Sequence, residues 1–308
     1  MDKGIAVRHS YSWVVMSVLA IGCMLAAGCS RAVSQQGSLV YQPRSEVYAE
    51  EDIQERYSAE EYEEMGDAGF SRADLEFAYM NYGKALKMDP KNQSLRSKRA
   101  WVLLAGNFND EAAREFTVVL EKNKNSAAAR EGLGQAHFQK KQYDQALVEF
   151  KKALEIDATR WRSHNFIGIM YNHNNDSLQA VEEFKAALAI KPDSGIIYNN
   201  LGMAYSLAGG YEEAVAAYHK AYELGAPREK TLNNLAMALA KMGRIVRAED
   251  VFKEVGDEAR AYNNIGCVYL AQGDQEMAAK SFESALRSSV DPYSTASKNL
   301  NKCRRAMP

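Results

Sequence analysis

The stretch "YNNLGMAYSLAGGYEEAVAAY", Tyr198 to Tyr218, reads as two short helices joined at Gly209 and Gly210. Apolar residues recur every three or four positions on both sides, and a glycine pair ends such a helix. Related stretches, "LNNLAMALAKMGRIVRAEDVF" and "YNNIGCVYLAQGDQEMAAKSF", start at Leu232 and Tyr262, and each carries the same asparagine pair. The sequence therefore predicts one helical hairpin, used repeatedly.

The composition is that of a globular, helical chain. Of 308 residues, 46% are hydrophobic and 25% charged, with only 6 prolines. Ala, Leu, Glu and Lys dominate after about residue 58, and runs of alternating β-branched residues are missing. The formal net charge of -2 provides no broad cationic field for phosphates, so we expect no nucleic acid partner.

The first residues have the layout of a secretory signal peptide. Lys3 and Arg8 precede an apolar stretch over residues 11–27 that closes on "LAAGC". We therefore expect residues 1–28 to be a signal peptide. An uncleaved transmembrane helix is the alternative, because the stretch is long enough to cross a bilayer.

The closing "LAAGC" resembles the lipobox of bacterial lipoproteins, in which small residues precede a cysteine that is lipidated and becomes the mature N-terminus. The resemblance implies acylation of Cys29, although Leu25 lies one place earlier than the usual pattern has it. Cys23, in "LAIGC", is the alternative. In that family a serine such as Ser30 implies sorting to the outer membrane, on its periplasmic side.

Residues 29–58 are polar and become acidic through "EVYAEEDIQE", as expected of a lipidated N-terminus followed by a solvated linker. The "SAEE" of Ser58 to Glu61 fits a capping box, in which the serine accepts a first-turn N–H and the glutamate reaches back. Helices are thus predicted from residue 59.

The hairpins align with a period of about 34 residues. Units are expected at 59–92, 93–126, 127–160, 161–194, 195–228, 229–258 and 259–292, followed by a polar capping helix at 294–306. Their pattern resembles the tetratricopeptide repeat family, through Tyr198, Leu201, Gly202, Tyr205, Ala214, Tyr218 and Ala221 of the quoted unit. The resemblance implies an all-α solenoid over 59–308, a right-handed superhelix of about seven helix hairpins plus the cap.

Two units depart from this pattern. In 93–126, Arg99 occupies a usually apolar place, and the turn "GNFND" is expected to be one residue longer than usual. The unit 229–258 is short, with Gly256 ending its second helix early, so we expect a local change of superhelix pitch there.

The candidate binding residues lie opposite the packed face of the first helices. They are Asn200, Asn234, Asn264, Met203, Met237 and Ile169. Primary amides donate and accept hydrogen bonds, and methionines adapt to varied side chains. The arrangement resembles the asparagine ladder of some peptide-binding tetratricopeptide proteins, which implies a protein or peptide partner in a concave groove. Alternatively, Asn199, Asn233 and Asn263 cap or bridge adjacent repeats, and Met203 and Met237 fill gaps between helices.

Signs of enzymatic chemistry are weak, so we expect no enzyme, metal or cofactor. "GLGQAH" at Gly132 lacks a third glycine and a preceding strand, and is interpreted as helix packing. The histidines are spread over separate units without carboxylate spacing. Cys267 and Cys303 are too few for a disulfide framework or a zinc site, and are expected to be small core or groove residues.

A lipobox, a spacer and a repeat array together resemble the tetratricopeptide lipoproteins of pilus and secretion systems. The ending "AYNNIGCVYLAQGDQEMAAKSFESAL" with "YSTASKNL" is most similar to those of tight-adherence (Tad/Flp) pilus assembly. The resemblance implies a part in assembling or localising an outer-membrane secretin or pilus machine. The alternative is a periplasmic adaptor that docks envelope hydrolases or proteases to substrates.

Overall fold

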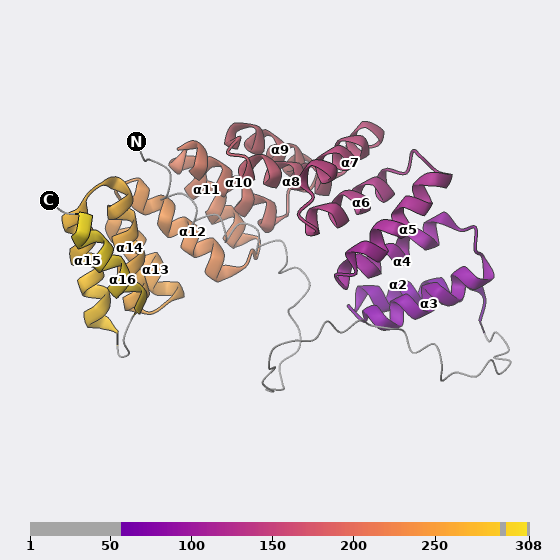
Figure 1. Ribbon diagram of the computed structural model, residues 1–308, viewed down its shortest axis with the longest axis horizontal. Helices are drawn as coiled ribbons and strands as arrows, with labels where there is room; N and C mark the ends of the chain where they lie inside the picture. The colour runs from indigo at the N-terminus through magenta and orange to yellow at the C-terminus, as the bar shows by residue number, and fades with distance from the viewer. Residues whose placement is uncertain (1–56, 290–293, 307–308) are drawn as a thin grey trace. The chain divides into compact units, whose positions relative to one another are not determined.

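The computed structural model describes residues 57–289 and 294–306 (Figure 1), and within these ranges it contains helices and no strands. This confirms the predicted all-α fold. The fifteen helices are α2 (Ala59–Ser71), α3 (Leu75–Met88), α4 (Gln93–Ala105), α5 (Asn109–Lys122), α6 (Ala127–Gln139), α7 (Tyr143–Ile156), α8 (Trp161–His173), α9 (Ser177–Ile190), α10 (Gly195–Ala208), α11 (Tyr211–Glu223), α12 (Arg228–Lys241), α13 (Ile245–Val255), α14 (Glu258–Gln272), α15 (Gln275–Ser288) and α16 (Ser294–Ala306).

The chain divides into two compact units, one ending at Gln142 and the other starting at Tyr143. The first unit contains the hairpins α2–α3 and α4–α5 together with α6. The second contains α7, the hairpins α8–α9, α10–α11, α12–α13 and α14–α15, and α16. The first helix of every hairpin begins within one residue of its expected start.

Within a hairpin, a large aromatic ring of the second helix packs on a glycine of the first. Gly202 and Tyr218 form such a pair, since a Cβ added to Gly202 would lie 2.7 Å from a ring carbon of Tyr218. The same spacing of sixteen residues recurs in Gly66–Tyr82, Gly168–Phe184 and Gly266–Phe282, and all these rings are buried. The small residue of the repeat pattern thus lets the two helices of one hairpin approach closely.

The turn between the two helices of a hairpin always contains one residue in the left-handed region. This residue is a glycine in three turns, Gly209, Gly243 and Gly273. In the other four turns it is Ala73, Asn107, Lys141 or Asn175. The turn of 93–126 is not longer than usual: Gly106–Phe108 separates α4 from α5 by as many residues as 140–142 separates α6 from α7. The expectation was wrong because Asn107 takes the left-handed place that glycine marks elsewhere.

The short repeat and the start of the first helix have the structure that the sequence predicts. Helix α13 has 11 residues and is capped by Gly256, as predicted. At α2, the Ser58 hydroxyl accepts the Glu61 N–H and Glu61 accepts the Ser58 N–H, which confirms the capping box.

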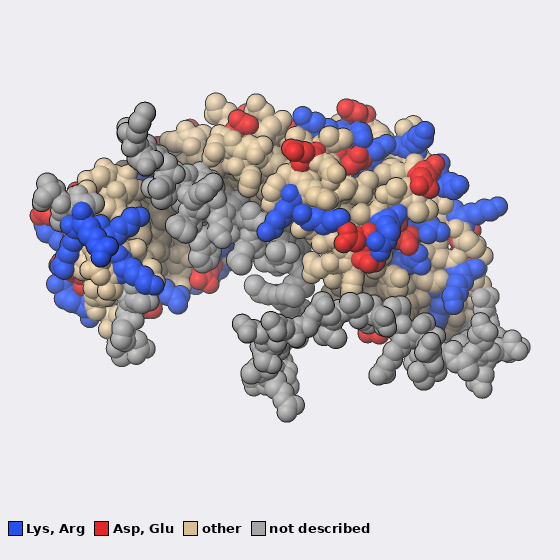
Figure 2. All heavy atoms as spheres, in the orientation of Figure 1, with Lys and Arg blue, Asp and Glu red and all other residues tan. Residues whose placement is uncertain are grey.

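The last helix, α16, closes the second unit. It buries Leu300 and Cys303 against Phe282 of α15, so the predicted C-terminal helix is present. Figure 2 shows Lys and Arg side chains gathered where α16 lies. None of the described helices is both long and apolar enough to cross a lipid bilayer. The predicted signal peptide, Cys29, Cys23 and the acidic linker up to residue 56 lie outside the described residues.

Candidate functional site

Asparagine side chains line the neighbouring first helices of the second unit. Helices α8, α10, α12, α14 and α16 contact one another in chain order, as Figure 1 shows for α10 and α12. We call the asparagines at matching places on them the amide row: Asn165, Asn199, Asn200, Asn233, Asn234, Asn263, Asn264 and Asn299.

Three junctions between these helices are closed by an amide–amide hydrogen bond. Asn200 Nδ2 donates to Asn165 Oδ1 at 3.0 Å, and Asn234 Nδ2 donates to Asn199 Oδ1 at 3.2 Å. Asn299 Nδ2 donates to Asn263 Oδ1 at 3.0 Å. In each case the later helix donates to the earlier one. Asn199 and Asn263 are only 4% and 6% exposed, so without these bonds their buried side chains would lose a partner.

The junction between α12 and α14 is different. Asn233 and Asn264 occupy the matching places, but neither side chain has a hydrogen bond to another described residue. They lie 31 positions apart, whereas the bonded pairs lie 35 or 36 apart, because the repeat containing α13 is short. Both amides are half-buried, and their side chains make no hydrogen bond with the described residues.

The apolar candidates differ in accessibility. Met203 and Met237 are half-buried, and Met237 packs against the core formed by α11 to α14. Ile169 is buried, with 8% of its surface exposed. Cys267 is half-buried, and its Sγ accepts from Asn299 Nδ2 at 3.7 Å. Burial raises the pKa of its thiol, which therefore stays protonated at neutral pH.

Other groups singled out in the sequence have structural partners. Gly132 packs against the ring of Phe116, in agreement with helix packing. His164 Nδ1 lies 2.7 Å from Glu183 Oε2, and Cys303 Sγ donates to the Gln275 carbonyl oxygen at 3.2 Å. The part of the chain that the structure describes contains no group of three His, Cys, Asp or Glu side chains placed to hold a metal ion.

The structure thus distinguishes among the candidate amides. Asn200 and Asn234 each use one N–H to bridge repeats. Asn199 and Asn263 accept such bridges, as the alternative interpretation proposed, whereas Asn233, which it also named, forms none with the described residues. Asn264 makes no bond with the described residues and stays available. Sequence reasoning missed Asn165 and Asn299, although their spacing of 35 and 36 residues to Asn200 and Asn263 could have revealed them.

Comparison with known proteins agrees with this architecture. Models of the tetratricopeptide repeat family match residues 97–160, 196–225, 230–255 and 259–289. The chain is a tetratricopeptide repeat protein, and proteins of this class mediate protein–protein interactions and are generally non-enzymatic scaffolds. No curated protein sequence matches it.

Several solved structures share the fold at low sequence identity. A tetratricopeptide repeat protein from Parabacteroides merdae is 19% identical, with a TM-score of 0.51, over 80% of this chain and 98% of that one. PilF from Pseudomonas aeruginosa is 18% identical, with a TM-score of 0.52, over 70% of this chain and 97% of that one. YrrB, a protein with an unusual peptide-binding site, is 23% identical, with a TM-score of 0.51, over 62% of this chain and 99% of that one.

Proposed function

We propose that this chain is a membrane-anchored, non-enzymatic scaffold that binds an extended segment of a partner protein along the amide row. Through that contact it assists the assembly or localisation of an outer-membrane secretin or pilus machine of the tight-adherence type. The site rests on the described residues, whereas the anchor and the machine rest on sequence resemblance.

The observation that carries the binding site is the pair of free amides at the α12–α14 junction. Asn233 and Asn264 are half-buried, and half-buried Met237 and Cys267 lie on the same two helices. An extended peptide presents alternating N–H and C=O groups, and a primary amide can bond either of them. A segment lying here would therefore find backbone partners together with adaptable apolar contacts.

The bridged amides support the same role by being held in place. The bond from Asn234 to Asn199 uses one N–H of Asn234 and leaves its other N–H and its oxygen unused among the described residues. A side chain that is already fixed loses less conformational entropy when a ligand binds. YrrB is described as having a peptide-binding site, which makes a peptide the first ligand class to test here.

The membrane anchor is supported by residues 1–30. The basic start, the apolar stretch and the "LAAGC" motif are arranged as in lipoprotein precursors, and Ser30 favours the outer membrane. More than one acyl chain on Cys29 would hold the protein stably, because a single chain gives only marginal membrane binding.

Photo-crosslinking in intact cells tests the site and the partner together. A benzoyl-phenylalanine replaces Asn264 or, in a second variant, Met203, and the control carries it at Glu213, an exposed residue of the second helix α11. We expect one partner protein to be trapped from positions 264 and 203 and not from the control.

The identity of the trapped protein then decides the function. A secretin or another pilus-assembly component supports the proposal, and an envelope hydrolase or protease would replace it with the adaptor function. A partner trapped only from position 213 would show that the amide row is not the binding site.

A further inference from the structure

A surface pocket of the first unit lies between α3 and α4, on elements that the amide row does not include. Its volume is about 440 Å³, a size that admits a few side chains of a ligand. Four cations line it, Lys84 and Lys87 from α3 and Arg96 and Arg99 from α4, and no lining residue is acidic. Apolar surface comes from Tyr79 and Met80, which are 41% and 53% exposed.

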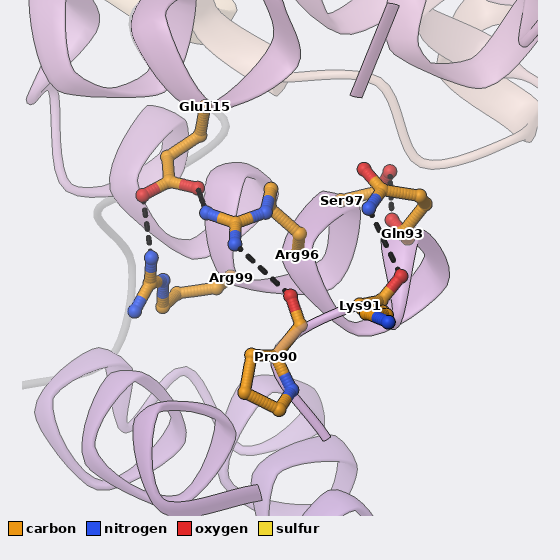
Figure 3. Close-up of polar contacts among 7 residues, drawn as sticks. All are labelled: Pro90, Lys91, Gln93, Arg96, Ser97, Arg99 and Glu115. Carbon is orange, nitrogen blue, oxygen red and sulfur yellow. Dashed lines mark hydrogen bonds and ion pairs between the residues drawn. The ribbon is translucent and has the colours of Figure 1, made fainter. Parts of the chain in front are cut away.

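The two arginines are held in place by one carboxylate (Figure 3). Arg96 Nη1 donates to Glu115 Oε2 at 3.0 Å, and Arg99 Nη2 donates to Glu115 Oε1. Arg96 also donates from Nη2 to the Pro90 carbonyl oxygen. Because Glu115 carries one negative charge and the arginines two positive charges, the cluster keeps an excess positive charge. Arg99, which departed from the repeat pattern, belongs to this cluster.

The lysines leave further positive charge uncompensated. Lys84 and Lys87 are exposed, and neither forms an ion pair with another described residue. The Lys84 ammonium lies over the ring of Tyr62, 5.1 Å from its centroid, and the Arg99 guanidinium lies 5.7 Å from that of Tyr79. The pocket therefore combines oriented cations with exposed aromatic and thioether surface, which suits a ligand that is both anionic and apolar.

A glycine keeps this pocket open. Gly83 lies inside α3 and lines the pocket, and a Cβ added there would meet no atom within 4 Å. Glycine inside a helix lowers stability by about 0.5 to 1 kcal/mol relative to alanine. Glycines such as Gly202 make room for a packed ring, but nothing packs on Gly83. Its effect on the described structure is to leave the pocket unfilled.

We propose that the α3–α4 pocket binds an acidic peptide segment in which carboxylates alternate with apolar side chains. The carboxylates pair with the exposed Lys84 and Lys87, and Arg96 and Arg99, which Glu115 holds in place, add positive charge. An apolar side chain lies over Gly83 between Tyr79 and Met80. This second contact is independent of the amide row.

The test uses the purified full-length chain in detergent and a short fluorescein-labelled peptide in which Asp and Glu alternate with Leu and Phe. Binding is followed by fluorescence anisotropy. We expect Gly83→Leu to weaken binding at least about tenfold, because its side chain fills the pocket, while the unfolding midpoint stays at or above wild type. Lys84→Gln with Lys87→Gln should weaken binding several-fold and reduce its salt dependence. Lys151→Gln, an exposed lysine of the second unit, is the matched control and should bind as wild type does.

The same peptide with Asn and Gln in place of Asp and Glu should bind poorly. Undiminished binding of this neutral peptide, or of the acidic peptide to Gly83→Leu, would overturn the proposal. The proposal would also be overturned if a single-stranded oligonucleotide bound the pocket and the acidic peptide did not. Asn264→Ala should leave this binding unchanged, so failure here is distinguishable from failure of the amide-row function.

Discussion

The same residue at the same place in the hairpin has different roles in this chain, depending on the length of the repeat before it. Asn234 follows a repeat of ordinary spacing and closes a bond to Asn199, whereas Asn264 follows the short repeat and closes none with the described residues. An asparagine of the amide row is therefore structural at one junction and free for a ligand at the next.

Replacing each of these two asparagines by alanine separates the two roles. Asn234→Ala leaves the buried Asn199 oxygen without its partner, so we expect the free energy of unfolding to fall by about 1 to 3 kcal/mol. Asn264→Ala removes no internal bond and should change it by less than about 0.5 kcal/mol. Chemical denaturation of both variants measures the difference, and equal midpoints would contradict the assignment of roles.

Lys230 gives the second prediction at this scale. It lies half-buried in the first turn of α12, and burial lowers its pKa to about 8. The positive end of the helix dipole also disfavours a cation there. Below pH 8 the lysine is charged in both the folded and the unfolded chain. Burying this charge in the folded chain costs desolvation free energy and lowers stability.

Between pH 8 and about 10.5 the unfolded chain holds more protons at this site, so the free energy of unfolding should rise with pH. Lys230→Met should be more stable than wild type at pH 7 and lack this rise. Urea denaturation of wild type and Lys230→Met across this pH range tests both expectations. The control is Lys151→Met, which replaces an exposed lysine. A wild-type slope that persists in Lys230→Met would show that another group titrates.

At the scale of the hairpin, turn geometry is more uniform than turn sequence. Every turn between paired helices places one residue in the left-handed region, although alanine, lysine and asparagine occupy it in some repeats and glycine in others. A residue with a Cβ pays a conformational cost there that glycine does not.

Exchanging glycine and alanine at two such turns should therefore have opposite effects. Ala73→Gly should raise the free energy of unfolding by about 0.5 to 1 kcal/mol, and Gly209→Ala should lower it by about 1 kcal/mol. Thermal unfolding of both variants and of the wild type, followed by circular dichroism, measures these changes in stability. If Ala73→Gly proves destabilising, the entropy of the unfolded chain outweighs the relief of strain.

The hairpins could be predicted from sequence because their signals are local. Small residues at a fixed place, glycine turns and the capping box at Ser58 lie within a few positions of what they determine. The turn after α4 was misjudged because Asn107 replaces glycine. The amide bridges join residues 35 or 36 apart, and whether they form depends on how far one repeat advances the next helix. The α3–α4 pocket is lined by side chains of two helices, and its arginines are held by Glu115 of a third, α5. Of these residues only Arg99 gave a sequence signal.

At the scale of the whole molecule, each compact unit carries its own candidate contact surface. The first has the basic pocket between α3 and α4, and the second has the amide row. The proposed anchor at Cys29 precedes both in the chain, separated from α2 by an acidic segment. Anchoring and folding should therefore be independent.

Replacing Cys29 by alanine tests this independence. We expect Cys29→Ala to lose acylation and outer-membrane fractionation while the repeats keep the wild-type melting curve, because the lipid attaches outside the packed helices. Membrane fractionation and metabolic labelling with a fatty acid measure the first effect, and circular dichroism the second. A variant that is still acylated and sorted would point to Cys23 instead.

The fixed direction of the amide bridges sets a rule for how such a chain can be lengthened or shortened during evolution. A hairpin inserted after α8–α9 must offer a donor to the unit before it and an acceptor to the unit after it, or two asparagines lose their partners. Helix α16 supplies the final donor, Asn299. The α12–α14 junction uses no such bond among the described residues, so recombination that exchanges repeats there would break no amide bridge.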